Sequence, residues 1–258
     1  MSEQGNSLVA RLLHRATLRR WRKLSRKARD LAPAQLRRAR FQARQLRVNL
    51  NDVIHVADEK LALPVVGSNA FQKPFGTDWA WRPAAWSRRL PVPGLSSVQT
   101  KSMLGDEVTM FHDCAFSELT LRQLRNTREE DLAAYGLRMD VFRFDGSFLS
   151  LVIDLPNQAV HGLRKDHVIR VETIVERESP IEIFARLNIK NGPNTEQIVR
   201  EVPMQQGGEM MVEFDLGYSE IAENRLESAW VDLIFEGAQM NQVTIRDLTC
   251  WRLPRAEI

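Results

Sequence analysis

The chain has 258 residues, enough for one large domain with an appendage or for two small domains. Hydrophobic residues make up 43% and charged residues 27%, which excludes a wholly disordered or a collagen-like chain. The two cysteines exclude a disulfide scaffold and a four-cysteine zinc site. No apolar run approaches the roughly 18 residues that a membrane-spanning helix needs.

Charge is distributed unevenly along the chain. Residues 1–50 hold 14 basic and two acidic residues, a net charge of +12, whereas the remainder holds 22 basic and 31 acidic residues, a net charge of −9. A basic segment joined to an acidic body indicates contact with an anionic polymer or surface, or a segment that folds back on its own domain. No secretory signal is visible around Arg11, so we expect a cytoplasmic protein with reduced thiols at Cys114 and Cys250.

Residues 1–60 are predicted to form a basic amphipathic helical extension. Apolar residues recur at spacings of three and four on both sides of Pro33, whose ring disfavours helix at the preceding residue. We therefore expect two helices within residues 7–57, the first capped by Ser7. The apolar stripe of the second helix is typical of packing along another helix, in a hairpin, a homo-oligomer or a docked arrangement.

The first of these helices carries the predicted anionic-surface site. This site consists of six basic residues: Arg19, Arg20, Arg22, Lys23, Arg26 and Lys27. Such a helix can neutralise nucleic-acid phosphates or lie in a membrane interface. We favour an anionic inner membrane face over nucleic acid, because bulky residues such as Leu13 and Trp21 could insert. A solvated face on an oligomerising hairpin is the alternative.

Residues 61–97 are predicted to be a linker or an irregular strap over the next domain, because prolines and glycines break any regular period. Three tryptophans lie close together here: Trp79, Trp81 and Trp86. Indole rings stack on sugar rings, so the three are a candidate ligand platform, or else they plug the end of the next domain. An extended backbone would send Trp79 and Trp81 to the same face.

Residues 98–258 are predicted to form an antiparallel two-sheet sandwich, so the fold class is mainly β. Segments of alternating hydrophobicity, clearest over residues 181–190 and 230–235, are separated by turn signals at the spacing of sandwich proteins.

Two local signals add detail to this region. Asp145-Gly146 lies between two such segments and predicts a hairpin with a type I′ turn. Thr127 followed by Glu130 matches a capping box and predicts a short helix over residues 128–135.

Residues 212–216, 229–235 and 243–249 together resemble the jelly-roll sandwich of galactose-binding-like domains and carbohydrate-binding modules. The resemblance implies a glycan ligand, on a concave sheet face or at edge loops, and a structural calcium with a ligand from the last strand. Asp247 matches that position loosely, but no set of partner oxygens accompanies it, so we predict no metal and no cofactor. The whole chain also resembles an uncharacterised bacterial protein family of unknown function.

Polar side chains on outward strand faces form a second candidate ligand site. Glu182, Arg186 and Asn188 lie on one strand, and Trp230 and Asp232 are expected to join them from a neighbouring strand. Planar hydrogen bonds from such groups suit hydroxyl-rich or acidic sugars. A solvated face with cross-strand charge pairs is the alternative.

No catalytic residue is predicted. His112 and Cys114 share one side of a strand, which permits a nucleophile pair, but no cysteine-protease signature surrounds them. Our leading interpretation is a non-catalytic binding module for a glycan or another polar ligand. A carbohydrate-active hydrolase or lyase on the same sandwich and a protein scaffold are the alternatives.

Overall fold

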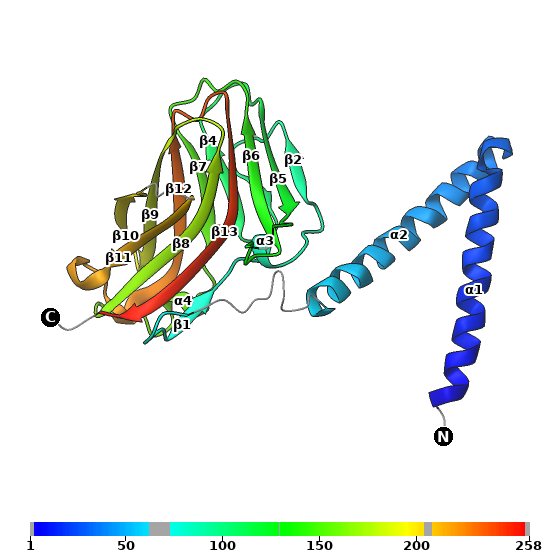
Figure 1. The fold of residues 1–258 in the computed structure, drawn as a ribbon, viewed down its shortest axis with the longest axis horizontal. Coiled ribbons are helices and arrows are strands. Elements are labelled where there is room, and N and C mark those ends of the chain that lie inside the picture. Colours follow the sequence, from blue (N-terminus) through cyan, green and yellow to red (C-terminus); the bar gives the residue numbers. More distant parts are fainter. Residues whose placement is uncertain (1–2, 62–72, 129, 204–207, 256–258) are drawn as a thin grey trace. The chain divides into compact units, whose positions relative to one another are not determined.

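The computed structural model describes residues 3–61, 73–128, 130–203 and 208–255 (Figure 1). The chain divides into two compact units, residues 1–54 and 55–258. The first is helical, and the second is a sandwich of two antiparallel sheets. The predicted fold class, a mainly β sandwich with an N-terminal basic helical extension, is therefore confirmed.

The helical unit contains α1 (Glu3–Lys27), a 3-10 helix η1 (Ala28–Asp30) and the greater part of α2 (Pro33–Leu61). Because α1 begins before Ser7, the prediction that Ser7 caps it is wrong. The break at Pro33 is confirmed, and α2 starts at this proline. The N–H groups in the first turn of a helix have no hydrogen-bond partner within the helix, so the N–H that proline lacks is not missed there. Among the described helices, none is both long and apolar enough to cross a membrane.

The sandwich consists of two layers that we call sheet I and sheet II (Figure 1). Sheet I contains β1 (Trp79–Trp81), β2 (Gly94–Ser96), β5 (Leu119–Arg125), β6 (Tyr135–Val141), β8 (His167–Arg177), β11 (Glu209–Asp215) and β13 (Asn241–Pro254). Sheet II contains β3 (Ser102–Leu104), β4 (Val108–His112), β7 (Leu149–Asp154), β9 (Glu182–Asn191), β10 (Asn194–Glu201) and β12 (Leu226–Glu236). Short helical turns lie between strands: α3 (Ala84–Ser87), α4 (Asn157–Val160), η2 (Leu216–Tyr218) and η3 (Glu223–Arg225).

Strand order fixes which side chains meet. The strand order of sheet I is β11-β8-β13-β6-β5-β2, and β1 pairs with the C-terminal end of β13. The strand order of sheet II is β10-β9-β12-β7-β4-β3. The alternation predicted over residues 181–190 is confirmed, since Ile183, Ala185 and Leu187 are buried between the sheets while Glu182 is exposed. The other face of sheet II is turned away from this core and is free to carry polar groups.

Residues 79–96 are more regular than the predicted strap. They supply β1 and β2 to sheet I, with α3 between them. Pro83 directly precedes α3 and Pro93 directly precedes β2, so neither ring removes a hydrogen bond from the interior of a strand. The prolines therefore lie directly before regular elements here and do not prevent them. Pro64 and Gly67 lie outside the described residues.

The predicted hairpin at Asp145-Gly146 is wrong. β6 belongs to sheet I and β7 to sheet II, so these two residues connect the sheets. Position 146 requires glycine because there is no room for a side chain, and not because its φ is positive. A Cβ there would lie 2.8 Å from the Phe144 ring and 2.9 Å from the Cys114 backbone nitrogen.

The helix predicted over residues 128–135 is also wrong. The described residues of this segment form turns and bends, and β6 already begins at Tyr135. The N–H of Arg128 donates to the Asp131 carboxylate (2.8 Å), which closes the turn through a side chain and replaces the expected capping box.

Candidate functional site

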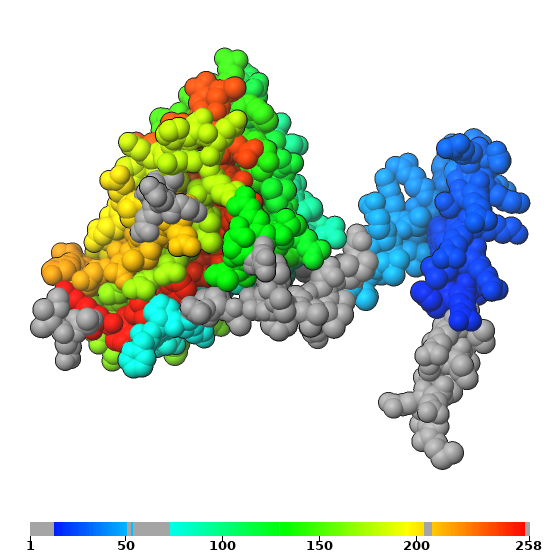
Figure 2. Space-filling model, viewed as in Figure 1, coloured from blue at the N-terminus to red at the C-terminus, as the bar shows by residue number. Residues whose placement is uncertain are grey.

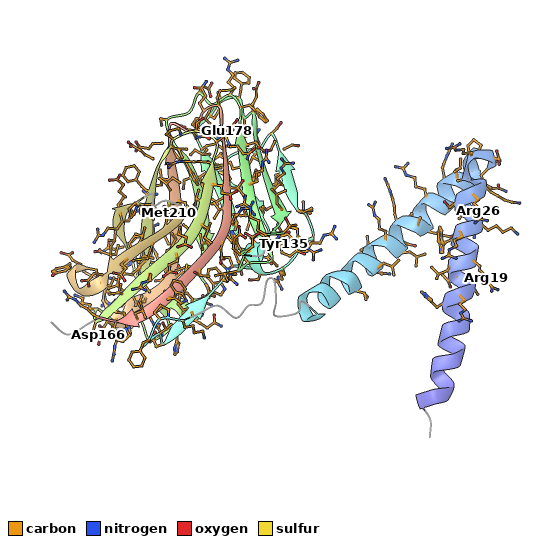
Figure 3. All side chains as sticks on the ribbon, viewed as in Figure 1. Arg19, Arg26, Tyr135, Asp166, Glu178 and Met210 are labelled. Carbon is orange, nitrogen blue, oxygen red and sulfur yellow. The ribbon has the colours of Figure 1, made fainter. Side chains whose placement is uncertain are left out.

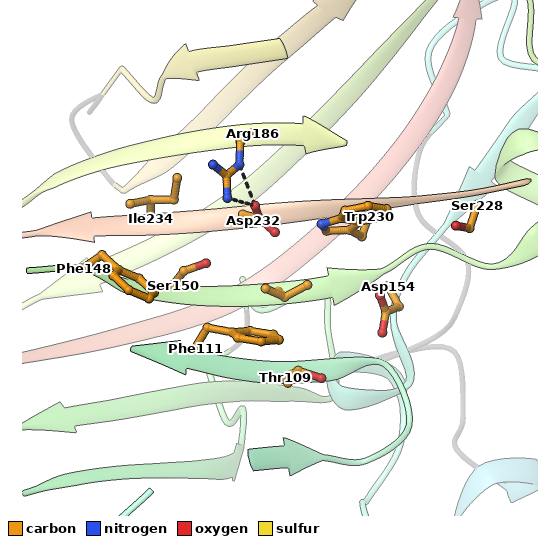
Figure 4. Close-up of a pocket in the computed structure, with 11 residues that line it drawn as sticks. Thr109, Phe111, Phe148, Ser150, Asp154, Arg186, Ser228, Trp230, Asp232 and Ile234 are labelled. Carbon is orange, nitrogen blue, oxygen red and sulfur yellow. Dashed lines mark hydrogen bonds and ion pairs between the residues drawn. The ribbon is translucent and has the colours of Figure 1, made fainter. Parts of the chain in front are cut away.

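A cleft of about 770 Å³ lies on the outward face of sheet II, across β4, β7, β12 and β9 (Figure 4). Eleven residues line it: Thr109, Phe111, Phe148, Ser150, Val152, Asp154, Arg186, Ser228, Trp230, Asp232 and Ile234. Alternate residues of a strand share a face, so every second position of β7 and β12 enters the cleft. The lining combines aromatic rings, hydroxyl groups and charges, which is the composition of a site for a polar organic ligand.

Antiparallel register arranges these residues in rows across the strands. One row contains Thr109, Val152, Asp232 and Arg186, and the next contains Asp154, Trp230 and Asn188. The predicted approach of the β9 side chains and the β12 side chains is therefore confirmed. Directly opposed side chains interact strongly in such a sheet, so the rows decide which charges pair.

Asp232 and Arg186 form the charged centre of the cleft. The Arg186 Nε and a terminal guanidinium nitrogen both donate to Asp232 Oδ2, at 2.7 and 2.6 Å, and Asn188 Nδ2 donates to the same oxygen at 3.1 Å. Asp232 is only 2% exposed although it belongs to the outward face. Its other oxygen, Oδ1, is buried and accepts no hydrogen bond from the described residues. A buried acceptor without a donor is costly, so this oxygen is a candidate contact for a ligand.

Hydrogen bonds around Asn188 fix this centre from below. Gln197 Nε2 on β10 donates to Asn188 Oδ1 (2.9 Å), which leaves the Asn188 amino group facing Asp232. Asn188 is 1% exposed, so it positions Asp232 and does not line the cleft.

Asp154 is a second carboxylate at the cleft. Partial burial, followed by the charge of nearby Asp232, raises its pKa above the ordinary value. The two aspartates occupy diagonal positions on β7 and β12. With Arg186 already paired to Asp232, the ionised lining holds more negative than positive charge.

Aromatic rings supply the apolar surface of the cleft. Phe111 and Trp230 are half-buried, and Phe148 is 43% exposed. Phe111 lies on β4, Phe148 directly precedes β7 and Trp230 lies on β12, so the rings come from three different segments (Figure 4). An aromatic surface beside fixed charges favours ligands that combine apolar faces with hydroxyl or amino groups.

The structure separates the predicted ligand residues. Arg186, Trp230 and Asp232 line the cleft together, and Asn188 lies beneath it. Glu182 does not belong to the lining, because it is exposed at the start of β9, opposite Glu236.

None of the three tryptophans of residues 79–86 lines this cleft, because Trp79 and Trp81 lie on β1 of sheet I and Trp86 lies on α3. Trp79 and Trp81 are half-buried on the same face of β1, with ring centroids 6.4 Å apart, as their spacing predicts. β1 lies beside β13, and cyan and red residues are adjacent at the surface in Figure 2. Trp86 is fully buried and its Nε1–H donates to the Ile245 carbonyl (2.9 Å), so Trp86 fills the core and is not a ligand residue.

The cysteines have structural roles. The Cys114 thiol donates to Asp145 Oδ1 (2.7 Å), while the buried His112 contacts the Val98 carbonyl through Nε2 (2.8 Å), so no Cys–His nucleophile pair forms. Burial raises the pKa of the Cys250 thiol to about 12, which fits the expected core role.

Asp247 is bound at both oxygens by the Arg82 guanidinium (2.8 and 2.7 Å). Among the residues that the structure describes, no cluster of His, Cys, Asp and Glu side chains could hold a metal ion.

The six residues of the predicted anionic-surface site are all exposed on α1. Figure 3 labels two of them, Arg19 and Arg26. Arg20 also donates to the Gln42 side chain of α2 (3.4 Å), a weak contact that leaves the basic face open to solvent.

Sequence reasoning missed the part of the cleft contributed by β4 and β7. The polar residues Ser150 and Asp154 alternate with buried Leu151 and Ile153, which marks them as outward-facing. Nothing in the sequence shows that β7 lies beside β12, because four strands, β8 to β11, lie between them along the chain.

The family comparison covers the whole chain, since the matching family model spans residues 1–258. The chain belongs to DUF6478, a family of unknown function. No curated protein matches it.

Several solved structures resemble the sandwich. The carbohydrate-binding module TmCBM61, in complex with β-1,4-galactotriose, is 13% identical, with 57% of this chain and 88% of that chain covered and a TM-score of 0.35. The family 11 module from Clostridium thermocellum, in complex with a mixed-linked tetrasaccharide, is 8% identical, with 64% and 97% covered and a TM-score of 0.36.

The enzymatically active domain of tailspike protein 4 from bacteriophage CBA120 is 7% identical, with a TM-score of 0.40 over 60% of this chain. This chain spans only 21% of that one. Similarities this distant transfer no function, so the case for a function depends on the cleft itself.

Proposed function

We propose that the protein is a non-catalytic binding module for a glycan or a similar polar ligand, which binds in the cleft on sheet II. The observation that supports this proposal is one cleft in which half-buried aromatic rings adjoin a charge centre held by hydrogen bonds. Sugar rings present apolar C–H faces that stack on aromatic rings, and hydroxyl groups that bind carboxylates. Because Arg186 and Asp232 are ordered before a ligand arrives, binding costs less conformational entropy.

Affinity electrophoresis through gels that contain single polysaccharides tests this proposal. We expect at least one polysaccharide to retard the full-length protein, and we expect Trp230→Ala to abolish the retardation. Trp79→Ala is the matched control, since Trp79 is also a half-buried strand tryptophan but lies in sheet I. Retardation by no polysaccharide, or equal loss in both variants, would contradict glycan binding in this cleft.

A hydrolase or lyase in the same cleft is the second candidate, and the two aspartates favour it. Diagonal positions on antiparallel strands lie about 7–8 Å apart, comparable with the spacing of paired glycosidase carboxylates. Asp154 has the raised pKa that a general acid needs, but Asp232 is held by Arg186 and Asn188. Release of new reducing ends that Asp154→Asn abolishes would contradict a purely binding role.

We further propose that the basic extension associates with an anionic surface, for which we favour the inner membrane face, so that the protein acts at the cytoplasmic side. The exposed basic residues of α1, together with the exposed Leu13 and Leu18, support this proposal. Binding to vesicles that contain anionic lipid should weaken with salt.

Reversing three of these charges, in Arg19→Glu, Arg22→Glu and Arg26→Glu together, should abolish vesicle binding. Stronger binding to nucleic acid than to vesicles would instead support a nucleic-acid partner. Self-association would support oligomerisation through the helices, and capture of a protein would support a scaffold.

A further inference from the structure

We infer that the cleft on sheet II accepts saccharides without acidic groups and rejects those that carry carboxylates, and that Asp232 determines this choice. The inference rests on the proposed glycan binding and specifies the ligand class. The sequence is compatible with both hydroxyl-rich and acidic sugars as ligands, and this inference favours the hydroxyl-rich ones.

The ionisable groups of the lining are unequal in number. Asp154 and Asp232 are acidic, and Arg186 is the one basic residue among the eleven lining residues. Arg186 commits its Nε and one terminal nitrogen to a single oxygen of Asp232. Lys190 lies opposite Ser228 in register but does not belong to the lining. A sugar carboxylate in the cleft would therefore meet uncompensated negative charge, whereas hydroxyl or ammonium groups would not.

The unpartnered oxygen of Asp232 places this charge at the floor of the cleft. Oδ1 is buried and accepts no hydrogen bond within the described part of the chain, and it is turned away from the Arg186 guanidinium (Figure 4). Charge in such a water-poor position acts more strongly than the same charge in bulk water. The complementary chemistry is a hydrogen-bond donor, and the excluded chemistry is an anion.

A matched pair of polymers tests the inference with the full-length protein. The first is any neutral hexose polysaccharide that retards the protein, and the second is the same polymer after oxidation of its C6 hydroxymethyl groups to carboxylates. We expect oxidation to weaken binding at least about tenfold, because like charges brought together in a binding site cost several kcal/mol.

Asp232→Asn should remove this discrimination. Arg186 and Asn188 both donate to the position of Oδ2, so the amide oxygen of the variant must occupy that position and its amino group must replace Oδ1. The floor then loses its negative charge and presents a donor, so we expect the two polymers to bind within about threefold of each other, a difference of under about 1 kcal/mol. Glu182→Gln is the matched control, because it removes one charge on the same strand face outside the lining, and it should keep the wild-type discrimination.

The outcomes separate the two proposals. Equal binding of both polymers by the wild type, or unchanged discrimination in Asp232→Asn, overturns this inference and leaves the proposed function standing. Retardation by no polysaccharide overturns the proposed function and this inference with it. If Asp232→Asn does not fold, Asp154→Asn removes one charge from the same lining and is expected to reduce the discrimination.

Discussion

Two tryptophans of one short segment have different surroundings. Trp86 is fully buried and hydrogen-bonded to the Ile245 carbonyl, whereas Trp79 is half-buried on β1. We predict that Trp86→Ala lowers the free energy of unfolding by roughly 3–5 kcal/mol, because it leaves a large cavity. Trp79→Ala should cost clearly less. Urea denaturation of both variants measures the difference. Equal losses of unfolding free energy in the two variants would show that burial of Trp86 does not stabilise the core more than Trp79 does.

The buried ion pair between Arg82 and Asp247 gives a prediction with a pH signature. Burial raises the pKa of Asp247 even though Arg82 opposes the shift. Arg82→Ala should cost about 3–5 kcal/mol at pH 7, since it leaves a carboxylate buried without its cation. Without Arg82, the pKa of Asp247 in the folded state would rise further. A carboxyl group whose pKa is higher in the folded than in the unfolded state destabilises the fold as pH rises through the folded-state pKa.

The loss caused by Arg82→Ala should therefore shrink when urea denaturation is repeated at acidic pH, where Asp247 is protonated. Arg138→Ala is the control, because Arg138 pairs with Asp140 at a more exposed position and should cost about 1 kcal/mol or less. An equal loss for Arg82→Ala at both pH values would contradict the role of the buried charge.

Individual strands were predictable from the sequence, but their partners were not. The alternation over β9 and β12 depends only on which face each residue takes, and a local pattern contains that information. Asp145-Gly146 has the residues of a hairpin turn, yet β6 and β7 belong to different sheets, which no local pattern reveals. The β12 side of the cleft was predictable because face alternation is a local pattern. Asp154 was missed because its place in the cleft depends on which strand lies beside β7.

The connection through Gly146 yields a prediction for the link between sheets. Gly146→Ala should destabilise the sandwich by roughly 1–3 kcal/mol, because the new methyl group would meet the Cys114 backbone nitrogen at 2.9 Å. Gly162→Asn is a suitable control, since position 162 has φ of +76° and nothing within 4 Å of a Cβ, and Asn tolerates this conformation. Thermal melting of both variants measures the difference, and an undisturbed Gly146→Ala would show that the link has room to shift.

At the scale of the whole molecule, the division into two units predicts independent stability. A chain that begins at Leu61 retains every strand of both sheets. We expect it to remain folded and soluble, with the melting temperature of the sandwich unchanged, and to lose binding to anionic vesicles. Calorimetry of the full-length and shortened chains tests this, and a large drop in melting temperature would show that the extension stabilises the sandwich.

The position of β13 within sheet I has a consequence for biosynthesis. β13 lies between β8 and β6 and also pairs with β1, so in the described chain the two halves of sheet I are joined by hydrogen bonds to this strand. Until the ribosome has added residue 254, β6 and β8 each present an open edge to other nascent chains. We therefore expect sheet I to close late, after the rest of the sandwich has been synthesised, and we expect the growing chain to depend on chaperones that cover these edges.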